Sequence, residues 1–281
     1  MEKSWTILEI IKSSEEALKN KNIKNPRLNA EILLSDALNI KRIDLYLNYD
    51  KPLNNQEIDF YKEKLKRRMN HEPLQYIRGF TEFYGLKFNV NSSVLIPRQE
   101  TELLVEKSIE IIKQFNSPRL IEIGTGSGCI SAAIGKNSIC NIDAVDIDEN
   151  ALSLAEENAA MNDVKNINFI KRDIKSFKDF NDYDIVVSNP PYISRIEFEL
   201  VDEEVKNYEP HYALTDDGDG LTYYNIIFDL AVSTDKELHL LLEIGDGKKN
   251  IIEKLVQDKK IKEYTFFKDL LNIDRVLHIK L

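Results

Sequence analysis

From Arg119 to the C-terminus, short apolar runs alternate with segments of helical spacing, and this alternation limits the fold more than any other feature. Strands that alternate with helices form a parallel sheet with helices on both faces. The sequence therefore predicts a doubly wound, Rossmann-like α/β domain of seven strands that ends in a hairpin. The expected strands are Leu120–Ile123, Asn141–Val145, Ile167–Lys171, Asp184–Ser188, Leu238–Ile244, Tyr264–Phe267 and Arg275–Lys280. The expected helices lie near 128–136, 149–162, 219–232 and 248–258.

Residues 1–72 show helical periodicity instead. Asn25 followed by Pro26 is typical of an N-cap with proline at the first helical position. A further helix is expected to begin near Asn55. The apolar positions that share one face of the first helix are Ile7, Ile10, Ile11 and Leu18. Together these patterns predict a small N-terminal helical bundle over 1–72.

The helix that begins near Asn55 carries a basic run, and two interpretations of it stay open. The basic side chains are Lys62, Lys64, Lys66, Arg67 and Arg68. Such a run is most often a solvated helix face. It could instead be a docking surface for a protein partner.

Residues 73–98 change character again. Aromatic and β-branched side chains alternate there with Gly79, Gly85 and a polar turn at 91–93, which predicts a β-hairpin linker between two domains. Pro97 ends this segment before a helix expected over Thr101–Phe115. The remaining residues, 99–281, then form the α/β domain.

Charge and composition exclude several classes of protein. The net charge is −10, and residues 1–72 carry 14 basic and 12 acidic side chains against 24 and 36 in the remainder. Because nucleic-acid binding draws most of its strength from basic contacts, we expect no direct binding of DNA or RNA. No run approaches the roughly 20 apolar residues of a membrane helix. We expect a cytoplasmic protein, no membrane partner and, with two isolated cysteines, no metal site.

A glycine-rich turn follows the first expected strand of the α/β domain. Residues 120–128 read Leu-Ile-Glu-Ile-Gly-Thr-Gly-Ser-Gly. Glycines at these positions let the backbone turn tightly and approach a ligand closely. The candidate cofactor-binding residues in this turn are Glu122, Gly124, Thr125, Gly126, Ser127 and Gly128.

An acid at the end of the second strand supports a nucleoside site. Asp146 is placed to accept hydrogen bonds from ribose hydroxyls, although it could instead cap the next helix, a role for which Asp148 competes. Asp173 and Ile174, after the third strand, are expected to hold the adenine. The G-x-G-x-G spacing and the acidic domain favour S-adenosyl-L-methionine, a cation without phosphate, over a dinucleotide.

The tetrapeptide Asn189-Pro190-Pro191-Tyr192 follows a buried strand, where open α/β sheets place their ligands. The Asn189 side-chain oxygen and the Pro190 carbonyl can each accept a hydrogen bond from an amide NH₂ group. Accepting both bonds exposes the nitrogen lone pair to a sulfonium methyl group, and Tyr192 can stack on the planar amide. We therefore assign catalysis to Asn189, Pro190 and Tyr192, and substrate binding to these three and Pro191. Asn189 is also a candidate cofactor-binding residue.

These motifs resemble the peptide-chain release factor N5-glutamine methyltransferases over nearly the whole chain. The matching segments are Pro73–Ile77, Leu95–Glu102, Asn189–Tyr192, Asp219–Leu221 and Asp274–Val276. The resemblance implies a class I S-adenosylmethionine-dependent domain, a helical domain that holds a release factor, and S-adenosyl-L-homocysteine as a product. The implied substrate is the glutamine of the release factor's Gly-Gly-Gln loop. Gln99 stands where the family has proline, and Ile174 where some relatives have tryptophan.

Two alternatives differ from this interpretation. A nucleic-acid adenine N6-methyltransferase uses the same tetrapeptide on an exocyclic amine, but it needs phosphate contacts to hold the strand. The acidic balance after residue 72 argues against it. A noncatalytic S-adenosylmethionine-binding protein would not require an intact tetrapeptide.

Overall fold

The computed structural model describes residues 5–281 and divides the chain into two compact units. The first unit comprises the chain up to Gly79 together with Glu203–Tyr208. The second comprises Phe80–Asp202 and Glu209–Leu281. The first four residues of the helical domain expected over 1–72 lie outside the described part.

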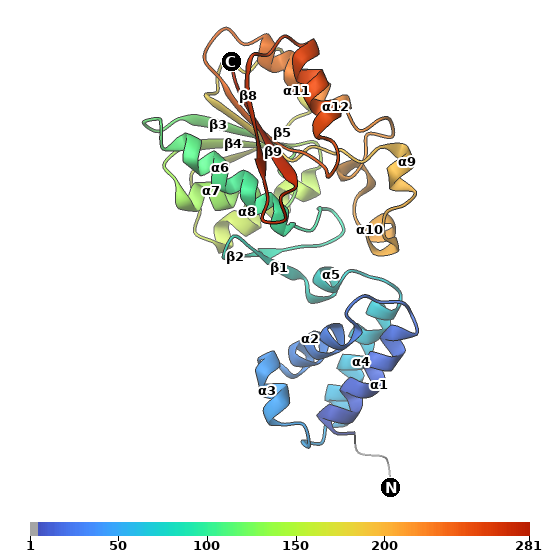
Figure 1. Cartoon of the computed structure of the whole chain (residues 1–281). Coiled ribbons are helices and arrows are strands. Elements are labelled where there is room, and N and C mark those ends of the chain that lie inside the picture. Colours follow the sequence, from blue (N-terminus) through green and yellow to red (C-terminus); the bar gives the residue numbers. More distant parts are fainter. Residues whose placement is uncertain (1–4) are drawn as a thin grey trace. The chain divides into compact units, whose positions relative to one another are not determined.

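The first unit is the predicted helical bundle, shown in blue and cyan in Figure 1. Thr6 and Glu9 form a capping box that starts the first helix, and Asn54 and Glu57 do the same for the fourth. The side chains packed at its centre include Ile7, Ile11, Leu33, Leu34 and Tyr61. The helices are α1 (Ile7–Lys19), α2 (Pro26–Leu38), α3 (Arg42–Leu47), α4 (Asn55–Met69) and α5 (Leu74–Arg78).

The start of α2 was predicted correctly, with Asn25 as the N-cap residue and Pro26 after it, but the cap lacks its usual side-chain hydrogen bond. Pro26 is the first helical residue, whereas the Asn25 side chain makes no capping hydrogen bond. Asn25 has a φ of 51°, in the left-handed region that asparagine tolerates better than most residues. The residue therefore turns the chain into the helix through its backbone conformation, without a side-chain hydrogen bond.

Arg68 does not lie on a solvated face. Its guanidinium group is buried and donates to Asn29 Oδ1 at 2.7 Å, to the Glu72 carbonyl at 2.8 Å and to Glu204 at 2.6 Å. Glu204 lies in α10 (Glu203–Tyr208), a short helix from the second half of the sequence that belongs to this unit. Lys62 and Lys66 of the same basic run are exposed.

The second unit begins with the predicted hairpin, β1 (Phe80–Phe83) and β2 (Leu86–Asn89). Its turn is bound to α6 (Glu102–Ile112), because the Tyr84 N–H donates to Glu102 at 2.8 Å. A 3₁₀ turn over Gln99–Thr101 precedes α6, and Gln99 is exposed at its start.

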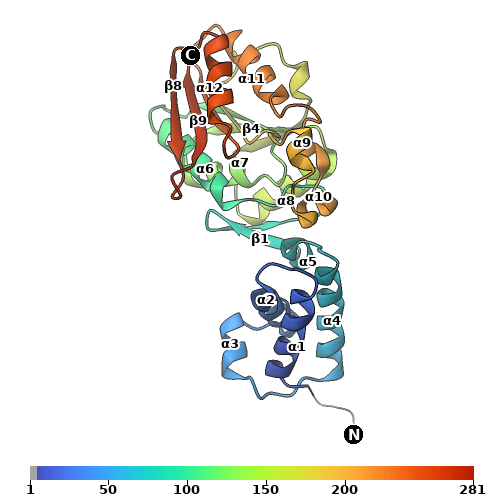
Figure 2. The same ribbon diagram turned by 45° about the vertical axis from the view of Figure 1, so that its right-hand side comes forward.

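The sheet has seven strands in the order β5-β4-β3-β6-β7-β9-β8. The C-terminal strands β8 and β9 lie side by side in Figures 1 and 2. Neighbouring strands are parallel from β5 to β7, and β9 runs antiparallel to both β7 and β8. The C-terminal hairpin was therefore predicted correctly. The strands are β3 (Arg119–Ile123), β4 (Asn141–Asp146), β5 (Ile167–Lys171), β6 (Ile185–Ser188), β7 (His239–Glu243), β8 (Glu263–Lys268) and β9 (Asp274–Lys280).

Alternate residues of each strand pack on opposite faces of the sheet, as the pleat requires. In β6, Ile185 and Val187 join the core formed with α6 and α7 (Cys129–Asn137), and Val186 joins the core formed with α11 and α12. Figure 1 shows α6, α7 and α8 (Glu149–Met161) on one side of the sheet and the other two helices apart from them. The bounds of those two helices are Thr222–Val232 for α11 and Lys249–Asp258 for α12.

Four short helices were not predicted from the sequence. They are α3, α5, α9 (Arg195–Phe198) and α10, each of four to six residues. One or two turns are too short to show a 3.6-residue period. Within residues 5–281, no helix is both long and apolar enough to cross a membrane.

Candidate active site

The candidate site lies where the order of the parallel strands reverses. The chain runs outward from β3 through β4 to β5 and then returns to form β6 on the other side of β3. At such a switch point the loops after adjacent strands separate and leave a crevice. A pocket lies there, and eight of the predicted site residues line it: Gly124, Gly126, Asp146, Asp173, Ile174, Asn189, Pro190 and Pro191.

The three glycines of the cofactor loop have different surroundings. All have positive φ values, of 75° at Gly124, 52° at Gly126 and 76° at Gly128. A Cβ atom on either of the first two would meet no atom within 4 Å, so their backbone is open to a ligand. A Cβ atom on Gly128 would lie 2.9 Å from the Cβ of Ala155 in α8. Gly128 therefore allows two helices to pack closely and does not line the pocket.

Asp146 connects the cofactor loop to the end of β4. Its carboxylate accepts the N–H of Gly126 at 2.9 Å and that of Asp148 at 3.0 Å. Burial raises the pKa of this carboxyl, although these backbone donors favour the ionised form. Asp148, not Asp146, caps α8, by accepting the Asn150 N–H at 2.8 Å. Asp146 keeps free lone pairs at the pocket wall.

Glu122 lies beneath the loop and does not line the pocket. It is fully buried, and its Oε2 accepts the Thr125 hydroxyl at 2.7 Å and the N–H and hydroxyl of Ser131 in α7. Its Oε1 has no partner, and burial raises the pKa of the carboxyl to about 7. Thr125 and Ser127 are also buried away from the pocket wall.

A buried asparagine that no motif indicated supports the same loop. Asn158 of α8 donates to the Ser127 carbonyl at 2.9 Å and to the Asn89 carbonyl at 3.0 Å, and it accepts the Asn89 N–H at 2.7 Å. It thereby joins β2 to the cofactor loop. An asparagine within a helix carries no sequence signal for this role, because its partners are distant along the chain.

The adenine end of the predicted site follows β5. Asp173 accepts the N–H of Lys175 at 2.9 Å and begins a 3₁₀ turn over Ile174–Ser176. Ile174 is 6% exposed and presents an apolar wall to the pocket.

The tetrapeptide after β6 is fixed at both ends. The Ser188 hydroxyl donates to the Ile123 carbonyl at 2.7 Å, which joins the end of β6 to the end of β3. At the other end, a Cβ atom on Gly245 would lie 2.8 Å from the Tyr192 ring, and one on Gly220 would lie 2.3 Å from the Tyr192 carbonyl oxygen. Only glycine allows these close approaches. Tyr192 packs beside the pocket and does not line it.

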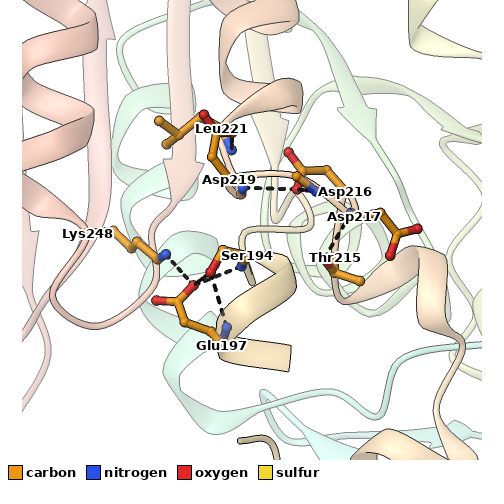
Figure 3. A network of polar contacts seen from close by, with 10 residues as sticks. Ser194, Glu197, Thr215, Asp216, Asp217, Asp219, Leu221 and Lys248 are labelled. Atoms are coloured by element: carbon orange, nitrogen blue, oxygen red, sulfur yellow. Dashed lines mark hydrogen bonds and ion pairs between the residues drawn. The ribbon is translucent and has the colours of Figure 1, made fainter. Parts of the chain in front are cut away.

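The loop that contains Gly220 is held mainly by the carboxylate of Asp216, while Asp219 accepts the Leu221 N–H at 3.0 Å. Asp216 accepts the N–H groups of Gly218 and Gly220, both at 2.9 Å, and that of Thr222 at 3.0 Å. Figure 3 shows this loop beside α9, where Glu197 accepts the N–H and hydroxyl of Ser194 and pairs with Lys248.

Several pocket residues were missed by the sequence analysis. Tyr212 donates its hydroxyl to Asp148 Oδ2 at 2.7 Å and lies 3.2 Å from the Ser93 carbonyl oxygen. The hydrogen bond from Tyr212 to Asp148 is the main reason why the pKa of Asp148 is lowered. Other missed residues that line the pocket are Val94, Leu95, Arg172 and Tyr223. Leu95 opens a segment that the resemblance singled out, but no site role was predicted for it, and the others come from segments without a recognisable motif.

Over residues 5–281, no three His, Cys, Asp or Glu side chains are grouped closely enough to hold a metal ion. The lining of the pocket suits a nucleoside, because it offers apolar side chains to the faces of a base and a carboxylate to ribose hydroxyls. It combines two open glycines, the Asp146 carboxylate and the apolar side chains of Ile174 and Ile227.

Comparisons with known proteins agree with this geometry. The family described as the PrmC N-terminal domain matches residues 9–79, and the methyltransferase small domain family matches residues 99–218. A release factor glutamine methyltransferase of Fusobacterium nucleatum is 40% identical over 97% of this chain and 78% of its own length. The chain belongs to the release factor glutamine methyltransferase family. A protein of the same name from Geobacter sulfurreducens is 38% identical over 86% of this chain and 85% of its own length.

Solved structures show the same fold. The catalytic domain of hMettl16, in complex with an RNA hairpin of the MAT2A 3′UTR, superimposes with a TM-score of 0.56. The match covers 70% of this chain and 76% of that one, at 18% identity. The chain therefore has the predicted Rossmann-like fold. Its family membership makes it a methyltransferase, and the PrmC N-terminal domain model covers its helical N-terminal region.

Proposed function

We propose that this methyltransferase uses S-adenosyl-L-methionine to methylate the side-chain nitrogen of the glutamine in the Gly-Gly-Gln loop of peptide-chain release factors. The observation that carries the proposal is the position of Asn189 and Pro190, two hydrogen-bond acceptors on the wall of a nucleoside-sized pocket. The names of the relatives supply the substrate class.

The cofactor would lie across the carboxyl ends of β3, β4 and β5. Asp146 would accept the ribose hydroxyls, and Gly124 and Gly126 would allow the methionine part to pass close to the backbone. Asp173 would accept the adenine amine, with Ile174 against the ring. When bound, the cofactor supplies an electrophilic methyl carbon on a positively charged sulfur.

The amide nitrogen of the substrate is a poor nucleophile because its lone pair is delocalised into the carbonyl. Asn189 and Pro190 would each accept one of its N–H groups, which turns the lone pair toward the methyl carbon. The carbon–nitrogen bond would form as the carbon–sulfur bond broke, with the electron pair left on sulfur, and the nitrogen would then release one proton to water. Tyr192 would support the planar amide from beside the pocket. Positioning and dipoles, without a strong base, would therefore account for most of the rate.

Mass spectrometry of an intact release factor, incubated with the enzyme and S-adenosyl-L-methionine, tests the proposal. We expect one added methyl group on the Gly-Gly-Gln glutamine, and none without the cofactor. A release factor in which that glutamine is replaced by alanine is the matched control. Methylation of adenine in DNA or RNA in preference to the factor would overturn the assignment.

A further inference from the structure

A second buried carboxyl group lies beside the tetrapeptide, and the mechanism above does not use it. Glu243 is the last residue of β7 and is 3% exposed. Ser188 of β6 is aligned with Leu242 of β7, so Asn189 and Glu243 follow at the same level of the sheet. One oxygen of the Glu243 carboxyl, Oε2, has no hydrogen-bond partner.

The other contacts of this carboxyl involve the proposed catalytic asparagine. The side chains of Thr101 and Asn189 lie close enough to the Glu243 carboxyl to favour its ionised form, which lowers its pKa against the effect of burial. Asn189 Nδ2 also lies 3.4 Å from the Thr101 hydroxyl oxygen. Glu243, Thr101 and Asn189 thus form a closed polar cluster at the edge of the buried sheet.

The chemistry of this cluster decides which way the asparagine amide faces. A carboxylate only accepts hydrogen bonds, whereas an asparagine amide offers NH₂ on one side and oxygen on the other. The NH₂ group must therefore point at Glu243 and Thr101, which leaves the oxygen free to face the pocket. The two ends have nearly the same shape, so packing alone would not select between them.

We propose that Glu243, together with Thr101, is a positioning residue that holds the Asn189 amide with its oxygen directed at the substrate nitrogen. This inference rests on the proposed role of Asn189. Glu243 acts through Asn189 and needs no contact with the substrate. An amide rotated by half a turn would present NH₂ to the substrate NH₂ group and would repel it.

The variant E243Q tests the inference, because glutamine keeps the shape but can present either end of its own amide to Asn189. We expect kcat on the release factor to fall at least about tenfold. KM for the factor and Kd for the cofactor should change less than about threefold, because remote contacts supply most of the factor's binding and Asp146 with the glycine loop supplies most of the cofactor's. The control is H239Q, which changes a buried residue at the opposite end of β7 and should keep wild-type kcat.

Thermal unfolding separates positioning from a merely structural role. Burial raises the pKa of the Glu243 carboxyl to about 7 in the folded protein. The free energy of unfolding therefore falls as the pH rises from the ordinary pKa of a glutamate to about 7, and this loss is complete at pH 8. At pH 8 the E243Q protein should therefore be at least as stable as wild type. A fall in kcat with a matching fall in Tm would assign Glu243 to stability alone.

The pH profile gives an independent result. Protonated Glu243 can donate to the Asn189 oxygen, so wild-type kcat should fall as pH drops through about 7, and E243Q should lose this dependence. The titratable groups that act on Glu243 or respond to it are Glu100, Cys129, Tyr192, Tyr224 and Arg275. Of these, only Arg275 favours the ionised carboxyl.

Nuclear magnetic resonance tests the orientation of the Asn189 amide directly, without enzyme turnover. In ¹⁵N-labelled wild-type protein, the Asn189 side-chain amide resonance should shift between pH 6 and 8, and E243Q should abolish that shift. An unchanged resonance in wild type would overturn the inference whether or not the factor is methylated. If E243Q does not fold, T101V should lower kcat and T101S should recover it, because serine keeps the hydroxyl.

The two proposals fail differently. An active E243Q with a wild-type pH profile, next to an inactive N189A, would overturn only the positioning role. A wild-type enzyme that leaves the release factor unmodified would overturn the proposed function.

Discussion

At the scale of single residues, Asp146 has two tasks that the sequence could not separate. It accepts two backbone N–H groups of the protein and also faces the pocket. Charge-assisted hydrogen bonds contribute roughly 1.5–3 kcal/mol each. Asp146→Ala should therefore weaken S-adenosyl-L-methionine binding at least about tenfold in calorimetry. Asp146→Asn keeps one acceptor oxygen, so its affinity for the cofactor should lie between those of Asp146→Ala and wild type. If Asp146→Ala binds the cofactor as tightly as wild type, Asp146 is not part of the site.

Asn189 should affect chemistry rather than cofactor binding. Its side-chain oxygen is the proposed acceptor for the substrate, and it forms only one part of the pocket wall. Asn189→Ala should nearly abolish kcat and leave the cofactor Kd close to wild type. Single-turnover kinetics at saturating cofactor measures this. If kcat stays within a few-fold of wild type, the positioning mechanism is wrong.

At the scale of elements, the end of β7 and the tetrapeptide after β6 are fitted to each other through Gly245. A Cβ atom there would lie 2.8 Å from the Tyr192 ring, which would have to move. Gly245→Ala should lower kcat about tenfold or more, because small displacements of positioning groups are costly. Steady-state kinetics on an intact release factor measures the effect.

Gly247→Ala is the matched control for that prediction. Gly247 has a φ of 72°, but a Cβ atom on it would meet nothing within 4 Å. The substitution should cost about 1 kcal/mol of folding stability through backbone strain and leave kcat intact. Equal losses of activity in both variants would mean that Tyr192 is not the affected group.

At the scale of the whole molecule, the helical unit is expected to select the substrate. A glutamine side chain offers little surface, so discrimination between exposed glutamines must come from remote contacts. Such contacts can also orient the reacting group, and losing them lowers kcat as well as raising KM. A short Gly-Gly-Gln peptide should therefore be a much poorer substrate than an intact release factor, as comparison of kcat/KM will show.

Deletion of residues 1–72 should have the same effect on the intact factor, with cofactor binding retained. The structure adds a condition, since this deletion removes Arg68, the buried partner of Glu204 in α10. Circular dichroism and cofactor calorimetry on the truncated chain are needed to show that the sheet still folds. Full activity of a folded truncated enzyme on the intact factor would exclude substrate selection by the helical unit.

Much of the fold was predictable because buried parallel strands leave a clear pattern. Ile185-Val186-Val187 is apolar throughout because both faces of β6 are covered, and the prolines after Asn189 end the strand. The site was predictable for a related reason. A glycine-rich turn and a proline-rich turn that follow two parallel strands must meet at the same edge of the sheet.

Other features left no local signal. In the sequence, Arg68 is part of a basic run that is typical of a solvated face. In the structure it is buried against Asn29 and Glu204, which are 39 and 136 residues away in sequence. Tyr212 comes from a short 3₁₀ turn and Glu243 from the end of β7, and neither segment has a motif that would predict a place near the site. Their roles depend on partners that only chain folding brings near.

Local sequence patterns were enough to predict which segments become strands, which turns must be open, and which side chains carry the proposed chemistry. These properties are local, because they follow from side-chain shape, backbone freedom and periodicity within a few residues. Three other features depend on long-range packing: Glu122 supports the loop from beneath, Gly128 packs against Ala155, and Glu243 lies beside Asn189. Those outcomes depend on burial and on hydrogen-bond partners far along the chain, since a carboxyl group acquires its pKa and its orientation from whatever surrounds it.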